Sequence, residues 1–258
     1  MLSRRDIACR ARAGAVVASL TLGVAACTPG ADPLSSNLQS SSSSTNAATA
    51  SVFSRDAVPA SAGPTRVVIK NPTLAQLKQT GPLEERAMGD PNARVTVIEY
   101  GSWTCPHCRA FREKTWPTFK REYIDTGKVH YILREFPIGR SSGNAALITR
   151  CAPKGDYFRL YDLYLKNQGS WVSQDVRTDK IYAVAAKAGM SRATFDACLK
   201  DEKLIAGITW QKNRGRELGV IGTPTFFINT THVRSFQSIE DMRRLIDPQL
   251  SGQTASAQ

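Results

Sequence analysis

The sequence contains no run of about 20 apolar residues, the length that a membrane-spanning helix needs. It also lacks an internal repeat, and its basic residues are scattered and form no nucleic-acid-reading motif. Its 34 lysines and arginines against 22 acidic residues therefore indicate solubility and weak attraction to anionic surfaces, not nucleic-acid binding. With 41% apolar and 22% charged residues among 258, the composition fits one globular domain with appendages, or two small domains.

The six cysteines fall into three groups. Cys9 and Cys27 lie near the N-terminus, a pair occupies positions 105 and 108, and two single cysteines follow at 151 and 198. If the first two are lost or modified during export, four remain. An even number of cysteines suits an oxidising compartment, where disulfides persist.

The first 27 residues have the order of an export signal. Four arginines between residues 4 and 12 precede the weakly apolar run Ala13–Ala26, which is too short to span a membrane. The Ser3–Ile7 segment resembles a twin-arginine signal, although two arginines also fit ordinary export. Val24–Cys27 resembles the lipobox of bacterial lipoproteins, in which the cysteine is lipidated. Ordinary cleavage near residue 25 or 26, or a buried N-terminal helix, is the alternative.

Residues 28–65 are rich in Ser, Ala, Thr and Pro and include the serine run Ser40–Ser44. Such a segment buries too little apolar surface to offset the entropy of ordering it, so we expect a flexible tether. A tether directly after Cys27 favours lipidation there. The expected location is the periplasm or the extracytoplasmic face of the membrane, with Cys27 as the anchor. A disordered tail is expected at 251–258.

From residue 66 onwards, strand-like and helix-like patterns alternate. The expected strands are Arg66–Lys70, Val95–Tyr100, Lys128–Phe136, Thr225–Asn229 and Thr231–Ser235. The expected helices are Thr73–Gly81, Pro106–Asp125 with a kink at Pro117, Asn144–Cys151, Tyr157–Asn167, Thr178–Gly189, Arg192–Asp201, Leu204–Leu218 and Ser238–Leu250. This order predicts an α/β fold with a parallel strand–helix–strand unit. A helical insertion at 140–218 then precedes a C-terminal β-hairpin and helix.

Cys105 and Cys108 stand where an expected strand gives way to an expected helix, in the run Cys-Pro-His-Cys. A thiolate attacks and leaves in disulfide exchange, and a helix N-terminus stabilises negative charge. Cys105 is therefore the expected nucleophile, and Cys108, one turn further in, is the resolving thiol. Pro106 fits the first helical turn, and His107 beside the thiolate favours the reduced form.

Two other uses of this run remain open. Its two thiols and one imidazole could supply three ligands of a metal site. However, His130 and His232 stand in expected strands without a neighbouring Cys or His, so no fourth ligand is evident. The two cysteines could also form a purely structural disulfide.

The runs Met88–Pro137 and Leu218–Asn229, which include the dithiol and a later Thr-Pro, resemble the DsbA-like proteins of the thioredoxin superfamily. The resemblance extends from about Leu83 to Leu250. It implies a thioredoxin-like domain made of residues 66–139 and 219–250, with the 140–218 helices inserted in it. It also implies an enzyme that introduces disulfides into exported proteins by dithiol–disulfide exchange.

The same resemblance assigns further residues. Thr223 and Pro224 match the family's cis-proline loop, where the backbone of Thr223 can pair with an extended substrate. An ordinary trans turn is the alternative. Glu99 matches the family's buried acid, which could exchange protons with Cys108. An exposed glutamate at a strand edge is the alternative.

Cys151 and Cys198 match a second cysteine pair that some members carry, so we expect a structural disulfide in the insertion. Two buried free thiols are the alternative. Trp103 either packs in the core or lines the rim of the substrate groove, and we expect it at the rim. Arg94 stands where the family pattern has proline after Ala93, which does not affect the chemistry.

The resemblance implies that no cofactor or metal is needed and that the protein is a monomer. Expected partners are unfolded or partly folded exported proteins with free thiols. A quinone-linked membrane oxidoreductase of the DsbB type would re-oxidise the pair. The rival functions are a reductase or isomerase, serving cytochrome c or copper-site maturation, and a lipoprotein that binds a soft metal.

Overall fold

The computed structural model describes residues 67–235 and 237–252. The expected export signal at 1–27, Cys27 and the expected tether at 28–65 lie outside the described residues, as does the end of the expected tail. Within the described ranges, no helix is both long enough and apolar enough to cross a membrane.

Five strands form one mixed sheet in the order β1-β3-β2-β4-β5. The strands are β1 (Arg86–Met88), β2 (Val95–Gly101), β3 (Val129–Glu135), β4 (Thr225–Ile228) and β5 (Thr231–Arg234). Only the central β2–β3 pairing is parallel, while β1–β3, β2–β4 and β4–β5 are antiparallel. The predicted α/β fold and its parallel unit are therefore confirmed.

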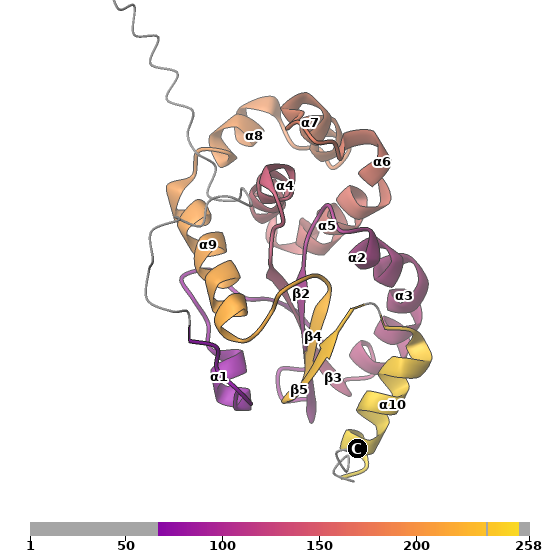
Figure 1. Ribbon diagram of the computed structural model, residues 1–258. Helices are drawn as coiled ribbons and strands as arrows, with labels where there is room; N and C mark the ends of the chain where they lie inside the picture. Colours follow the sequence, from indigo (N-terminus) through magenta and orange to yellow (C-terminus); the bar gives the residue numbers. More distant parts are fainter. Residues whose placement is uncertain (1–66, 236, 253–258) are drawn as a thin grey trace, which may run out of the picture. The chain divides into compact units, whose positions relative to one another are not determined.

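Helices cover both faces of the sheet and one of its ends, as Figure 1 shows. Besides α2 (Pro106–Ala110) and α3 (Trp116–Phe119), which follow the dithiol, the α-helices are α1 (Leu74–Lys78), α4 (Arg140–Arg150), α5 (Tyr157–Lys166), α6 (Gln168–Trp171), α7 (Thr178–Ala186), α8 (Arg192–Cys198), α9 (Glu202–Glu217) and α10 (Ile239–Leu250), with a 3₁₀ turn at Lys154–Asp156. In Figure 1, α4 to α8 gather beyond one end of the sheet, while α1 and α9 lie on the opposite side from α2, α3 and α10. The predicted helical insertion is confirmed.

The helix that follows the dithiol changes its hydrogen-bonding pattern along its length. α2 (Pro106–Ala110) and α3 (Trp116–Phe119) are α-helical, whereas Phe111–Thr115 and Lys120–Ile124 are π-helical. The amide of Trp116 bonds to the carbonyl of Phe111, five residues back. Pro117 lacks an amide hydrogen and its ring crowds the preceding turn, which accounts for the wider turn where a kink was predicted.

Every residue of the strand β2 is buried. Because the side chains of successive residues point to opposite sides of the sheet, both faces of the sheet are covered at this strand. Ile98 and Tyr100 pack with Phe227 and with Leu77 of α1 on one face. Val97 packs on the other face, in the larger cluster that includes the insertion helices. Glu99 alternates with Ile98 and therefore faces this larger cluster.

Three local predictions differ from the structure. The predicted strand at Arg66–Lys70 is absent from its described part, where one amide–carbonyl bond of 2.8 Å joins Ile69 to Glu217. β1 was not predicted, because three residues at a sheet edge carry no readable alternation. α6 was also not predicted, since a single turn is shorter than a period-based method can detect.

Candidate active site

The dithiol lies at the point where the central strand β2 leads into α2. Cys105 is the N-cap of α2 and Pro106 occupies its first turn. The amide of Cys108 donates to the sulfur of Cys105 at 3.3 Å, so the thiol takes the place of the usual capping oxygen. Both cysteines are free thiols in this structure. His107 is exposed beside them.

The two sulfurs differ in their acidity. A hydrogen bond from the Cys108 thiol, aided by the backbone amides of Cys108 and His107, lowers the pKa of Cys105 from 9.0 to about 6. Cys108 is fully buried, and this burial raises its pKa well above the ordinary value. At neutral pH, Cys105 is therefore the thiolate and Cys108 keeps its proton.

The Thr223–Pro224 peptide bond is cis, and the carbonyl of Thr223 lies 3.1 Å from the Cys105 sulfur. The expected loop therefore faces the dithiol across 118 residues of sequence. Cys105, Pro106 and Thr223 together line an open cleft of about 860 Å³. The rest of its wall comes from Ser102, Thr104, Gly222 and residues 138–141 and 172–176.

Glu99 lies beneath the dithiol in a fully buried position, as the resemblance implied. The hydroxyl of Tyr131 donates to Oε2 at 2.6 Å, while Oε1 has no hydrogen-bond partner. Burial raises the pKa of Glu99 from 4.5 to about 7, against the lowering effect of Tyr131 and of the Arg112 cation. The carboxyl can therefore bind or release a proton near neutral pH.

Sequence reasoning missed the cation in this region. Arg112 is buried, donates from Nε to Asp162 at 2.7 Å and stacks on Trp116 at 3.6 Å. Asp162 belongs to α5, so this ion pair links the active-site helix to the insertion. The only available signal was local: Arg112 follows Cys108 by four residues, which places both on one helix face.

Trp103 corrects an expectation, because it lies in the core and not at the rim. Its side chain is fully buried, and Nε1 donates to Oγ1 of Thr149 in α4 at 2.8 Å. Its ring packs edge-on against Tyr161 of α5 with centroids 4.9 Å apart. Trp103 therefore joins the active-site loop to the insertion.

Two polar residues that the sequence did not reveal fix the same loop. The amide of Trp103 donates to Oγ of Ser142 at 3.0 Å. The side-chain amide of Gln168 donates to the carbonyls of Trp103 and Cys105 at 2.9 and 3.0 Å. These contacts come from α4 and α6, so the insertion positions the backbone on which the nucleophile stands.

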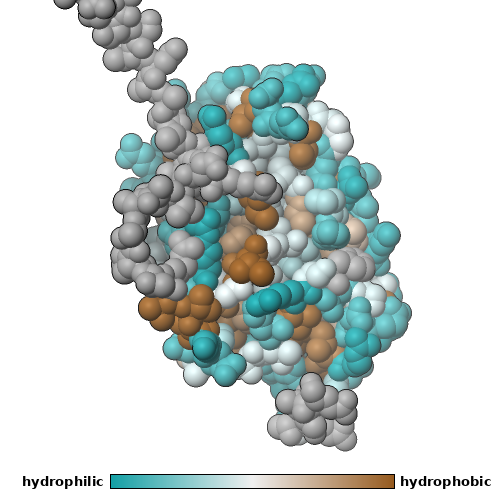
Figure 2. All heavy atoms as spheres, viewed as in Figure 1, coloured by the Kyte–Doolittle hydropathy of each residue, from teal (hydrophilic) through white to brown (hydrophobic). Residues whose placement is uncertain are grey.

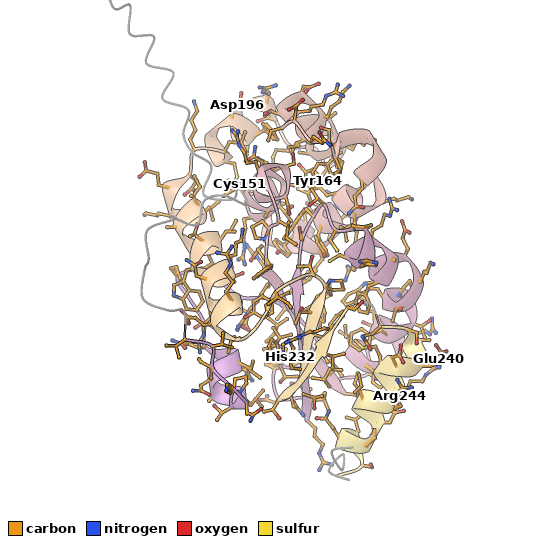
Figure 3. All side chains as sticks on the ribbon, viewed as in Figure 1. Cys151, Tyr164, Asp196, His232, Glu240 and Arg244 are labelled. Carbon is orange, nitrogen blue, oxygen red and sulfur yellow. A yellow bond between two sulfur atoms is a disulfide. The ribbon has the colours of Figure 1, made fainter. Side chains whose placement is uncertain are left out.

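Cys151 and Cys198 form the disulfide that the resemblance implied. It joins the end of α4 to the end of α8, and Figure 3 shows Cys151 among the insertion helices. Among the residues that the structure describes, no three His, Cys, Asp or Glu side chains gather as a metal site would require.

A family model described as thioredoxin matches residues 82–248, more than half of the chain. The chain belongs to the thioredoxin family. A Rickettsia conorii protein named as a protein-disulfide oxidoreductase is 30% identical over 194 residues, which cover 73% of this chain and 69% of that protein. Disulfide bond formation protein D of Bacillus subtilis is 24% identical over 180 residues, 64% of this chain and 77% of its own.

Solved structures agree with this assignment to the thioredoxin family. α-DsbA1 of Wolbachia pipientis is 27% identical, with a TM-score of 0.64 over 69% of this chain and 97% of its own. BdbD of Bacillus subtilis, at 19% identity and a TM-score of 0.60 over 73% and 100% of the two chains, shares the fold. The protein is thus a DsbA-like thiol–disulfide oxidoreductase of the thioredoxin family.

Proposed function

We propose that this enzyme works as a disulfide donor outside the cytoplasm, transferring the Cys105–Cys108 disulfide to exported proteins with free thiols. The observation that carries the proposal is the difference in acidity between the two sulfurs. A lowered pKa of Cys105 stabilises the reduced enzyme, because the thiolate exists only after the disulfide has opened. The oxidised enzyme is then the less stable form and gives its disulfide away.

The size of this effect follows from the pKa. Lowering the pKa of Cys105 from 9.0 to about 6 stabilises the reduced form by about 1.4 kcal/mol at pH 7. For a two-electron couple this corresponds to about 30 mV. The effect is fully present above pH 9 and is lost as the pH falls through about 6, since the folded pKa lies below the reference value.

The proposed reaction has two exchange steps. A substrate thiolate attacks the sulfur of Cys105, the Cys105–Cys108 bond breaks, and Cys108 leaves as a thiolate. Because burial raises the pKa of Cys108, this leaving sulfur takes a proton, which Glu99 can supply with its pKa of about 7. A second substrate thiolate then attacks the substrate sulfur of the mixed disulfide. The substrate is oxidised and Cys105 leaves as a thiolate.

The proposal also includes where the enzyme works and how its dithiol is re-oxidised. The sequence of residues 1–65 supports export, with Cys27 as a lipid anchor and a tether that lets the domain reach its substrates. A quinone-linked membrane oxidoreductase would accept the two electrons of the reduced pair. Labelling of cells with an alkyne fatty acid should modify the wild type and not the variant Cys27→Ser.

The equilibrium potential of the dithiol against glutathione tests the direction of transfer, with Cys151 and Cys198 followed separately by alkylation and mass spectrometry. A value near about −120 mV, as for DsbA, is expected for a donor. A value near about −270 mV, as for thioredoxin, would overturn the donor direction and favour a reductase. Stoichiometric metal after purification under reducing conditions would instead favour the metal-binding function.

A further inference from the structure

A second hollow lies beside the dithiol cleft. Its volume is about 450 Å³, and α9 contributes Lys212 and Arg216 to its wall. Val220 and Ile221, from the loop that leads to Pro224, also line it. Ile138 and Gly139 line both this hollow and the cleft that holds Cys105, so the two sites adjoin. We call the second hollow the Lys212 pocket.

In the Lys212 pocket, Lys212 carries a positive charge that has no partner among the described residues. Lys212 is 6% exposed, and no carboxylate among the described residues forms an ion pair with it. Buried lysines are rare unless they are paired. Burial, with the charge of Arg216 second, lowers the pKa of Lys212 to about 8, which leaves most of the ammonium charged at pH 7. An anion in the pocket would supply the missing charge.

The same area holds the exposed apolar surface of the described chain. Four large hydrophobic residues are exposed in the described ranges: Val67, Val68, Val172 and Ile221. Val68 and Ile221 line the Lys212 pocket, and Val172 lines the dithiol cleft. Figure 2 shows apolar surface near the middle and at the lower left of this face. Apolar walls around two cations suit a ligand that is partly apolar and carries an anion.

We propose that the Lys212 pocket binds an acidic side chain of the substrate polypeptide, close in sequence to the cysteine that reacts with Cys105. This rests on the proposed function, because the ligand is the substrate of the same dithiol. Ile221 and Thr223 stand two residues apart on one loop, with Ile221 in the pocket and Thr223 in the cleft. An extended chain rises about 3.3 Å per residue, so the acidic residue should lie about two to four positions from the cysteine.

The inference predicts a preference in the substrates. Reduced proteins with a glutamate or aspartate near the reacting cysteine, and an apolar residue beside it, should be oxidised faster than proteins with basic residues there. The carboxylate would receive charge-assisted hydrogen bonds from Lys212 and Arg216, which are stronger than neutral ones.

Equilibrium binding tests the preference without any redox step. Fluorescent peptides of about ten residues carry serine for cysteine and either glutamate or glutamine at each position up to four residues away. Anisotropy with the full reduced chain should give about tenfold tighter binding of the glutamate peptide at the best position. Lys212→Met with Arg216→Gln should bring this ratio close to one and leave binding of the glutamine peptide unchanged.

A matched control separates the effect of the pocket on binding from the effect of the protein's overall charge. Lys200→Gln with Lys203→Met removes two exposed positive charges before and within the first turn of α9, and it should keep the preference. Loss of the preference in both double variants, no change in either, or no preference in the wild type would overturn the proposal. Thermal unfolding checks that both variants fold.

Oxidation of the corresponding dithiol peptides then separates this inference from the proposed function. In the wild type, glutamate should raise kcat/KM about tenfold through a lower KM. If the protein binds the glutamate peptides preferentially but oxidises none, the donor function fails and the pocket assignment holds. If it oxidises all of the peptides at equal rates, the pocket assignment fails and the donor function holds.

Discussion

The two cysteine pairs of this protein have opposite surroundings. Cys105 and Cys108 cap a helix, border an open cleft and are free thiols. Cys151 and Cys198 join two helices of the insertion, 47 residues apart, as a closed disulfide. The first pair sits in a local field that makes one sulfur acidic, whereas the second forms a covalent link between helix ends.

The difference shows that placement decides what a cysteine does. A helix N-terminus, the neighbouring thiol and a facing loop act on Cys105 together, so the bond it forms is easily exchanged. The second pair is already joined as a disulfide, and its effect is to restrict the conformations of the unfolded chain.

Removing the two pairs should have opposite consequences. Cys105→Ser should reduce the exchange rate by more than about 1000-fold, because the nucleophile is lost. Cys151→Ala with Cys198→Ala should leave the exchange rate within about threefold and lower the free energy of unfolding by about 2 to 4 kcal/mol, as expected for a loop of 47 residues. Peptide oxidation and chemical denaturation measure the two effects. A large loss of exchange in the double alanine variant would contradict the contrast.

Within the first pair, alkylation should distinguish the two thiols. The rate of Cys105 modification by iodoacetamide should follow its thiolate with a midpoint near pH 6, because its pKa is lowered to about 6. Cys108 is fully buried and should react at least about 100-fold more slowly in the folded reduced protein. Mass spectrometry after timed quenching gives both rates. A midpoint near 9 would show that the helix end has little influence on Cys105.

The local part of this site could be predicted from sequence. A strand pattern, Pro106 and the spacing of Cys105 and Cys108 are all readable within one turn of chain, and they fix which thiol caps the helix. The contacts of Gln168 and Ser142 could not be predicted in this way, since they join segments about 40 to 60 residues apart. No period or motif in the sequence reports which distant side chain reaches a carbonyl.

The wrong predictions have the same physical origin. Val67 and Val68 have strand-forming side chains, but the described segment that contains them has no neighbouring strand, and a strand needs one to pair its backbone. Trp103 was expected at the rim, but it lies in the short loop between β2 and α2 and points into the core. Its depth depends on α4 and α5 closing over it, and sequence alone does not contain that information.

The raised pKa of Glu99 should make the stability of the protein depend on pH. Its pKa is about 7 in the folded protein against 4.5 as the reference, so between these values the folded state binds more protons than the unfolded state. The contribution of Glu99 to stability should therefore be fully present below about pH 4.5 and fall by about 3 kcal/mol as the pH rises through 7. Glu99→Gln should remove this dependence and be the more stable protein at pH 8. Denaturation midpoints at several pH values test it, and parallel curves for the two proteins would contradict the raised pKa.

Trp103 connects the surroundings of the two pairs, because Thr149, which accepts its hydrogen bond, stands two residues before Cys151. Trp103→Phe keeps an aromatic ring but removes that donor, leaving the buried hydroxyl with one partner fewer. We expect a loss of about 1 to 3 kcal/mol in unfolding free energy. If Trp103 acts from the core, KM for a peptide substrate should stay within about twofold. If Trp103 instead lay at the rim of the cleft, Trp103→Phe would raise KM with little change in stability. That result would contradict the buried position of Trp103.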